Sequence, residues 1–209
     1  MNLYLKRLFP YLVLVFIGFP SVFYRKGWLF ERLNDWHSPF LDGWFTTITW
    51  LGDATFAVFI LLWLYWFKNY KWVYAFVLGF VLHVIFVHIF KQWIAHGFER
   101  PFLYYQQIGL ESSFHWIEGV AIRKLNSFPS GHTATAFFFA TFLSQLNRKG
   151  LVYLWLFLAI MVGLSRVYIG QHWFMDIYVG MLFGLWSTIL SRYLVNRYPR
   201  PWFEKRRKQ

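Results

Sequence analysis

The sequence predicts an all-α fold, a bundle of six transmembrane helices with short interfacial helices between spans 3 and 4. Hydrophobic residues make up 58% of the 209 residues and charged residues only 14%, whereas a soluble domain carries about 25% charged residues. The apolar residues form long blocks separated by short basic clusters, as in a chain that crosses a bilayer repeatedly. We therefore expect a single membrane domain over residues 1–209, with no soluble domain attached.

Each expected span approaches the roughly 20 apolar residues that a bilayer requires. The first has no small-residue cleavage site after it, so we interpret it as a retained anchor and not as a signal peptide. The fourth and fifth are short, and we expect their flanks, residues 127–131 and Ser165-Arg166, to complete the crossing while buried in protein. The expected spans are Leu8–Tyr24, Thr46–Phe67, Trp72–Phe90, His132–Leu146, Leu151–Leu164 and Trp173–Val195.

The basic residues are distributed unequally between the two ends of this predicted bundle. If the N-terminus is cytoplasmic, 13 of the 21 Lys and Arg residues but only one of the nine acidic residues lie on the inner side. The net charge of +12 then resides on that side, as the positive-inside rule predicts for two cytoplasmic termini. Residues 197–209 form a basic cytoplasmic tail that an anionic leaflet would attract. This leaves no need for a nucleic-acid partner.

Two long segments, Arg25–Phe45 and Lys91–Pro129, face the outer side in this topology. The second contains several glycines and an aromatic patch at residues 114–117. We expect it to lie at the membrane surface as short helices, because it mixes aromatic and charged side chains.

Three polar clusters lie at the outer ends of spans, where packing alone does not explain them. The clusters are Lys91 with Arg100-Pro101, then Pro129-Ser130-Gly131-His132, and then Ser165-Arg166 with His172 and Asp176. A charge near the hydrocarbon region is costly, so cations gathered there are expected to face a polar ligand.

The chemistry of these groups suits a phosphoryl group. Two arginines can bind phosphate oxygens in a bidentate manner while Lys91 adds a point charge. Ser130 and Gly131, at the start of a helix, would present backbone N–H groups to the same oxygens. His172 and Asp176 are four residues apart, so on a helix they would share one face.

In that arrangement the carboxylate of Asp176 keeps one nitrogen of His172 protonated while the other nitrogen attacks. His132 remains as the proton donor to the departing oxygen. The chain has no cysteine and no cluster of carboxylates, so we expect phosphoryl transfer with neither a metal ion nor a cofactor.

These motifs resemble the signature of the PAP2 superfamily, the type 2 phosphatidic acid phosphatases, which also includes glucose-6-phosphatase and the vanadium haloperoxidases. The second and third motifs of that signature are complete in this sequence. The first differs, because eight residues instead of six separate Lys91 from Arg100. We expect a two-residue bulge around His96-Gly97 to absorb the difference.

The resemblance implies an integral membrane lipid phosphatase. His172 would form a phosphohistidine, Asp176 would orient it and His132 would protonate the leaving group. Phosphate would be held by Lys91, Arg100, Ser130, Gly131 and Arg166. The partners would be a lipid phosphate substrate and membrane lipids, with the active site on the outer or periplasmic side of the cytoplasmic membrane.

The substrate stays open among undecaprenyl diphosphate, phosphatidylglycerol phosphate, phosphatidate and lipid A phosphates. A lipid-to-lipid phosphotransferase of the same family is an alternative, because an alcohol can intercept a phosphohistidine as water does. A catalytically silent membrane scaffold is a weaker alternative, since both histidines and Asp176 are present.

Other polar or small residues favour structural interpretations. We expect Asp53 to cap the second span, and His83 and His88 to make hydrogen bonds between helices. Gly180 and Gly184 form a Gly-x-x-x-Gly pattern that is typical of helix packing.

Overall fold

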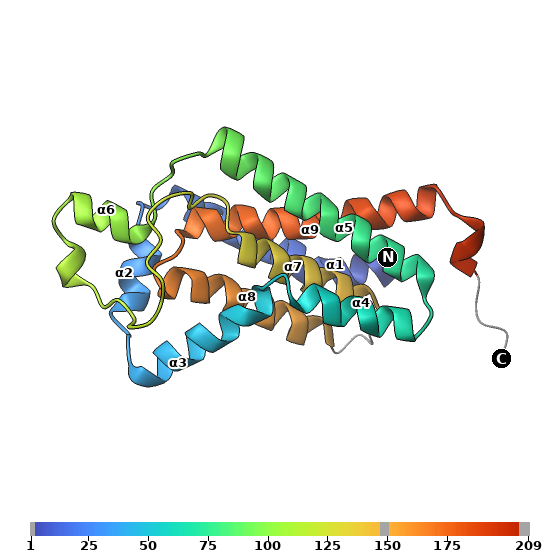
Figure 1. Ribbon diagram of the computed structural model, residues 1–209, viewed down its shortest axis with the longest axis horizontal. Coiled ribbons are helices and arrows are strands. Elements are labelled where there is room, and N and C mark those ends of the chain that lie inside the picture. Colours follow the sequence, from blue (N-terminus) through green and yellow to red (C-terminus); the bar gives the residue numbers. More distant parts are fainter. Residues whose placement is uncertain (1–2, 147–150, 205–209) are drawn as a thin grey trace.

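The computed structural model describes residues 3–146 and 151–204, and these ranges contain helices and no strand. The predicted all-α fold is therefore confirmed. Arg148, Lys149 and the tail beyond Glu204, which we expected on the inner side, lie outside the described residues. The helices are α1 Leu3–Gly18, α2 Trp28–Asn34, α3 Pro39–Ile48, α4 Phe56–Trp66, α5 Tyr70–Ile89, α6 Pro101–Gln107, α7 Gly131–Leu146, α8 Leu151–Tyr168 and α9 Phe174–Arg197 (Figure 1).

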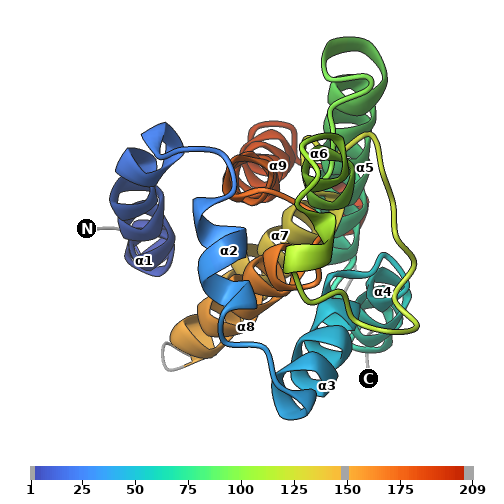
Figure 2. The same cartoon turned by 90° about the vertical axis from the view of Figure 1, so that its left-hand side faces the viewer.

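Helix α7 is the centre of the bundle. Twelve of its sixteen residues are buried, and Figure 2 shows it between α8, α9 and α5. A helix surrounded by protein needs no lipid-facing surface, which explains how α7 accommodates Thr133, Thr135 and Thr141 among its apolar residues. Phe138 and Phe142, both fully buried, pack with Phe76 of α5 in one of the hydrophobic cores.

Two glycines allow α9 to approach α7 closely. A methyl group at Gly184 would lie 2.4 Å from the carbonyl oxygen of Ala134, and one at Gly180 would lie 2.5 Å from that of Ser130. The packing interpretation of this Gly-x-x-x-Gly pair is therefore confirmed. The contact also fixes the start of α7 beside the start of α9, which is where the second and third polar clusters lie.

The second predicted span is bent. The segment Pro39–Gly52 and the helix Phe56–Trp66 meet at 51°, so a continuous helix over Thr46–Phe67 is wrong. Asp53 lies in the break, where its Oδ1 accepts a hydrogen bond from the Thr55 N–H at 2.8 Å. Gly52 packs against the backbone of His132, where a side chain would not fit. The bend thus places the chain against the start of α7.

Four helical segments within the described ranges are long and apolar enough to span a membrane, or five if the bent pair counts as one span. Helix α7, with 16 residues, is the remaining member of the expected six, so the six-span count stays a prediction. As expected, the polar flanks of the fourth and fifth spans are buried, with Ser127, Ser130, Ser165 and Arg166 each at most 8% exposed.

The two long segments between spans, which contain α2, α3 and α6, gather at one end of the bundle (Figure 1). Figure 2 looks onto this end and shows α2 and α6 over the bundle. The short helices expected between the third and fourth spans are α6 and the 3-10 turn Glu111–Ser113. Residues 115–117, in contrast, are not helical. Asn34 bonds both the N–H and the carbonyl of His115, and these contacts hold the aromatic patch against α2.

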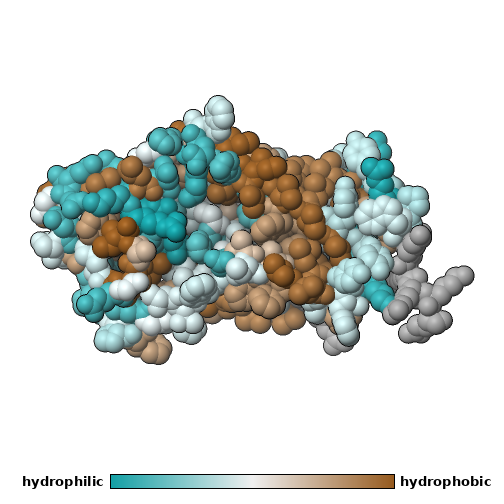
Figure 3. All heavy atoms as spheres, in the orientation of Figure 1, coloured by the Kyte–Doolittle hydropathy of each residue, from teal (hydrophilic) through white to brown (hydrophobic). Residues whose placement is uncertain are grey.

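The surface has the character of a membrane protein. Figure 3 shows hydrophobic residues gathered over the middle of the molecule, with hydrophilic residues concentrated at the end that carries α2, α3 and α6. Large apolar side chains such as Phe16 and Trp66 are at least 80% exposed, which suits a lipid environment. The first turn of α1 and the last turn of α9 lie away from the α2 and α6 end (Figure 1). The protein is a multi-pass membrane protein.

Candidate active site

The site centres on His172, which is 2% exposed. Helix α8 ends in a turn where Gly170 has a left-handed φ of +67°, a conformation that glycine adopts readily. This turn folds the chain back so that the carbonyl of Arg166 accepts the N–H groups of Gln171 and His172, both at 3.0 Å. The backbone thereby places His172 beside Arg166.

Asp176 holds the ring of His172 from one side. Its Oδ2 lies 3.2 Å from Nδ1 of His172 and accepts the Trp173 N–H at 2.9 Å. We expected the two residues to share one face of a helix, and this is wrong. His172 precedes α9, and Asp176 reaches back to it from the first turn of that helix. Since Nδ1 must carry the proton that it donates to a carboxylate, the lone pair resides on Nε2.

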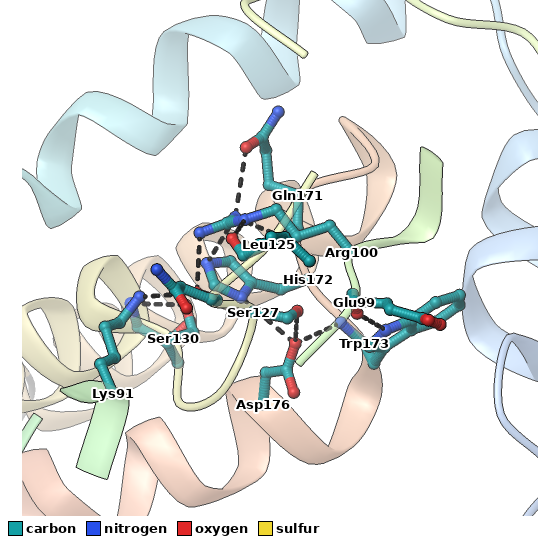
Figure 4. A network of polar contacts seen from close by, with 12 residues as sticks. Lys91, Glu99, Arg100, Leu125, Ser127, Ser130, Gln171, His172, Trp173 and Asp176 are labelled. Carbon is teal, nitrogen blue, oxygen red and sulfur yellow. Dashed lines mark hydrogen bonds and ion pairs between the residues drawn. The ribbon is translucent and has the colours of Figure 1, made fainter. Parts of the chain in front are cut away.

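Arg100 lies on the opposite side of the same ring, with its Nη1 at 3.4 Å from Nε2 of His172 (Figure 4). Arg100 is only 4% exposed, and it donates to the carbonyls of Leu125 at 2.8 Å and Gln171 at 2.6 Å. Burial and the charge of Arg123 lower the pKa of Arg100 to about 10, so it remains a cation at neutral pH.

Lys91 reaches the same place despite the longer spacing to Arg100. Its Nζ donates to the carbonyl of Asn126 at 3.2 Å, and Nη2 of Arg100 donates to that oxygen at 3.1 Å. The extra residues begin at a π-helical turn, Phe90–Ile94, where the Ala95 N–H bonds the Phe90 carbonyl. The bulge expected at His96-Gly97 therefore starts about one turn earlier, with Lys91 inside it.

Arg166 has a buried side-chain N–H group without a partner in the described part of the chain. Its Nη1 donates to Thr49 at 2.9 Å, while its buried Nε has no partner within the described part of the chain. An unpaired buried donor is costly, so this group is well suited to receive an anionic oxygen.

The second motif forms the start of α7. We expected the Ser130 N–H to face a ligand. Instead it donates to the backbone carbonyl of Asp176 at 3.0 Å. The N–H groups of Gly131 and His132, in the first helical turn, have no acceptor within the helix. These two groups, and not that of Ser130, can serve an anion there.

His132 and Arg166 line one cavity of about 350 Å³, together with Arg123, Asp53 and Thr49. A larger cavity of about 670 Å³ opens beside Asp176 and Ser127 and has an apolar lining that includes Phe98 and Phe174. His132, the proposed acid, and Arg166 thus share the first cavity.

Sequence reasoning did not identify several residues that build the site. Ser127 donates its hydroxyl to Oδ2 of Asp176, Asn126 supplies the carbonyl between Lys91 and Arg100, and Gln171 joins Arg100 to the carbonyl of Ala121. Arg123, on the loop before the second motif, lines the cavity. All four lie in irregular loops, where no spacing rule marks them.

Of the residues interpreted as structural, His83 has the expected role, whereas the bond between helices expected of His88 is not found within the described residues. His83 Nε2 lies 3.2 Å from the Thr135 hydroxyl of α7, which confirms the expected bond between helices. His88 is exposed. Asp53 accepts the Thr55 N–H in the turn before α4, but the N-cap of α4 is Thr55 and it has no side-chain capping bond, so the expected cap is not formed.

Comparison with known proteins gives a consistent result. Residues 71–200 match the family described as the PAP2 superfamily. An undecaprenyl-diphosphatase from Sulfolobus acidocaldarius is 38% identical over 65 residues, which are 31% of this chain and 32% of that protein. The curated relatives match this chain over about a quarter to a half of their own length.

Two solved structures resemble the whole bundle. The crystal structure of LpxE from Aquifex aeolicus aligns with a TM-score of 0.68 and 29% identity over 79% of this chain and 93% of that chain. A transmembrane PAP2-type phosphatidylglycerolphosphate phosphatase from Bacillus subtilis aligns with a TM-score of 0.62 and 20% identity, over 94% of this chain and 99% of that chain. The second likeness concerns the fold alone.

Proposed function

Since the chain belongs to the PAP2 superfamily, we propose that it is a lipid phosphatase that works through a phosphohistidine at His172. The observation that carries this proposal is the arrangement around one imidazole. Nδ1 of His172 meets Asp176, Nε2 faces Arg100, and the backbone of His172 is bonded to that of Arg166. Two of the relatives named above are called a diphosphatase and a phosphatase, and the third is LpxE.

In the first step, the lone pair on Nε2 of His172 attacks the phosphorus of the lipid phosphate. The bond between phosphorus and the lipid oxygen breaks, and His132 gives a proton to that oxygen. Asp176 holds the Nδ1 proton and stabilises the charge that develops on the ring. The lipid alcohol, or lipid phosphate, leaves.

In the second step, water attacks the phosphorus of the phosphohistidine. His132, which lost its proton in the first step, accepts one from the water. Inorganic phosphate leaves and the ring of His172 regains its lone pair. Protons and electron pairs balance over the two steps, and the enzyme returns to its starting state.

Lys91, Arg100 and Arg166 supply the charge stabilisation for this transfer. Fixed cations in a largely buried site stabilise the developing charge without reorganising at the moment of reaction. Arg166 has a donor available for an oxygen. We therefore propose that the reaction needs no metal ion.

We further propose that the active site faces the outer side of the cytoplasmic membrane. The site lies among the interspan segments at the α2 and α6 end, and the first turn of α1 and the last turn of α9 lie away from it (Figure 1). The excess of basic residues falls on the side of the termini, and cytoplasmic loops are those that carry such an excess.

Phosphate release from lipid phosphates by the purified full chain tests this function. We expect release to continue in EDTA and to be lost in His172→Ala. His88→Ala is the matched control, since it removes an exposed imidazole from α5, and it should retain activity. Retention of a tenth of wild-type activity by His172→Ala, or a loss in EDTA that Mg²⁺ restores, would contradict the proposal.

A further inference from the structure

Arg123 is a fourth cation at the site that belongs to none of the three motifs. It lies on the loop between α6 and α7, is exposed, and lines the cavity that contains His132 and Arg166. No acidic side chain of the described residues is within ion-pair distance of it. Asp53 lines the same cavity and is engaged by the Thr55 N–H.

The backbone on both sides of Arg123 is fixed by the active site. Arg100 donates its side-chain N–H groups to the carbonyls of Leu125 and Asn126, and its backbone N–H to that of Lys124 at 2.8 Å. On the other side, the amide of Gln171 donates to the carbonyl of Ala121 at 2.9 Å. Arg123 thus belongs to a segment held by residues that flank the nucleophile.

The other three cations, Lys91, Arg100 and Arg166, are assigned to the phosphoryl group that is transferred. Nη1 of Arg100 lies 3.4 Å from Nε2 of His172, where that group would bind, and the charges of Arg166 and Lys91 also act on this ring. The positive charge of Arg123 is repelled by these three cations, and its side chain is exposed and has no acidic partner among the described residues. A second anion in the cavity would offset this repulsion.

The position of the cavity indicates which part of a substrate would bring that anion. His132 protonates the leaving oxygen, so the atoms beyond that oxygen occupy the space next to His132. Arg123 lines this space. In a diphosphate ester the atom beyond the leaving oxygen is a second phosphorus, with charged oxygens that a guanidinium binds in a bidentate manner.

We infer that Arg123 is a specificity-determining residue that binds the second phosphate of a lipid diphosphate. This inference rests on the proposed function and names its substrate class. Attack at the terminal phosphorus breaks its bond to the bridging oxygen, which leaves as part of a lipid monophosphate. Arg123 stabilises the charge that this oxygen acquires, and His132 supplies its proton.

The test compares farnesyl diphosphate with farnesyl monophosphate, which differ only in the second phosphate. For the wild-type protein we expect a higher kcat/KM with the diphosphate. In Arg123→Gln the ratio of the two kcat/KM values should fall at least about tenfold, the effect of one charge-assisted hydrogen bond. Lys124→Gln is the matched control. Lys124 is the exposed neighbour of Arg123, but its side chain bonds Gln106 and does not line the cavity.

The outcomes separate this inference from the proposed function. If both substrates release phosphate and the ratio is the same in Arg123→Gln as in the wild type, Arg123 is an ordinary surface cation and the inference is wrong. An equal fall of the ratio in Lys124→Gln would also overturn it, since the effect would then come from general surface charge. If neither substrate nor any other lipid phosphate releases phosphate, the proposed function itself fails.

Discussion

His172 is surrounded by positive charge, which has a consequence for its protonation. Burial first, and then the charges of Arg100 and Arg166, hold the pKa of His172 well below its ordinary value of 6.5. Only the neutral ring has a lone pair for attack. The cations proposed to bind phosphate therefore keep the proposed nucleophile neutral at neutral and mildly acidic pH.

This gives a prediction for the pH dependence of kcat/KM. A lowered pKa means that His172 stays neutral as the pH falls through 6.5, so its acid limb should lie below pH 6.5. Lys91→Gln removes one of the cations that lower the pKa. The pKa of His172 should then rise and the acid limb should move to higher pH, by roughly one unit.

Comparing Lys91→Gln with the wild type isolates the titration of His172, because the substrate phosphate ionises in the same way with both proteins. Lys71→Gln, at the opposite end of α5, is the control and should leave the limb in place. An acid limb that does not move in Lys91→Gln would show that Lys91 does not act on the nucleophile. A shift to lower pH would contradict the direction of the electrostatic effect.

The motif residues of the site could be predicted because each lies at a fixed spacing from a helix end. Ser165-Arg166 and His172 flank one tight turn, and Asp176 belongs to the next helix. Asn126, Ser127 and Gln171 could not be predicted, since they act through loop carbonyls and a hydroxyl whose positions depend on the whole fold. Arg123 has no local pattern of its own.

At the scale of elements, the spans were predicted best where a helix is apolar and uninterrupted. Helix α5 and helix α9 were expected within about two residues of their ends. The bend at Asp53 was missed, because the hydropathy of Thr46–Phe67 continues across it. Its cause is tertiary: Gly52 fits against the backbone of His132, a contact that composition does not reveal.

The aromatic patch at residues 114–117 shows a second limit of pattern reasoning. A mixture of aromatic and charged residues indicated a helix at the membrane surface. In the structure Phe114 and Trp116 pack with Phe30 of α2, and Asn34 holds the backbone of His115. An aromatic residue serves equally well in a small protein core, so composition alone could not distinguish the two environments.

At the scale of the whole molecule, the predicted orientation can be tested by labelling. The natural chain has no cysteine, so single cysteines report one position each. In intact cells Gln107→Cys, at the exposed end of α6, should react with a membrane-impermeant thiol reagent. Asn69→Cys, before α5, should react only after the membrane is permeabilised. The reverse pattern would place the active site on the cytoplasmic side.

If a phosphoryl group passes through His172, a covalent intermediate can be trapped on that residue. His132→Ala removes the residue proposed as the proton donor and as the base that activates water. With an aryl phosphate, whose leaving group needs little protonation, the first step should proceed while hydrolysis is slowed. Mass spectrometry under alkaline conditions, where phosphohistidine is stable, locates the phosphate.

We predict phosphate on His172 in His132→Ala, and none in the double variant His132→Ala/His172→Ala. Phosphate on another residue, or equal labelling of the double variant, would contradict the account.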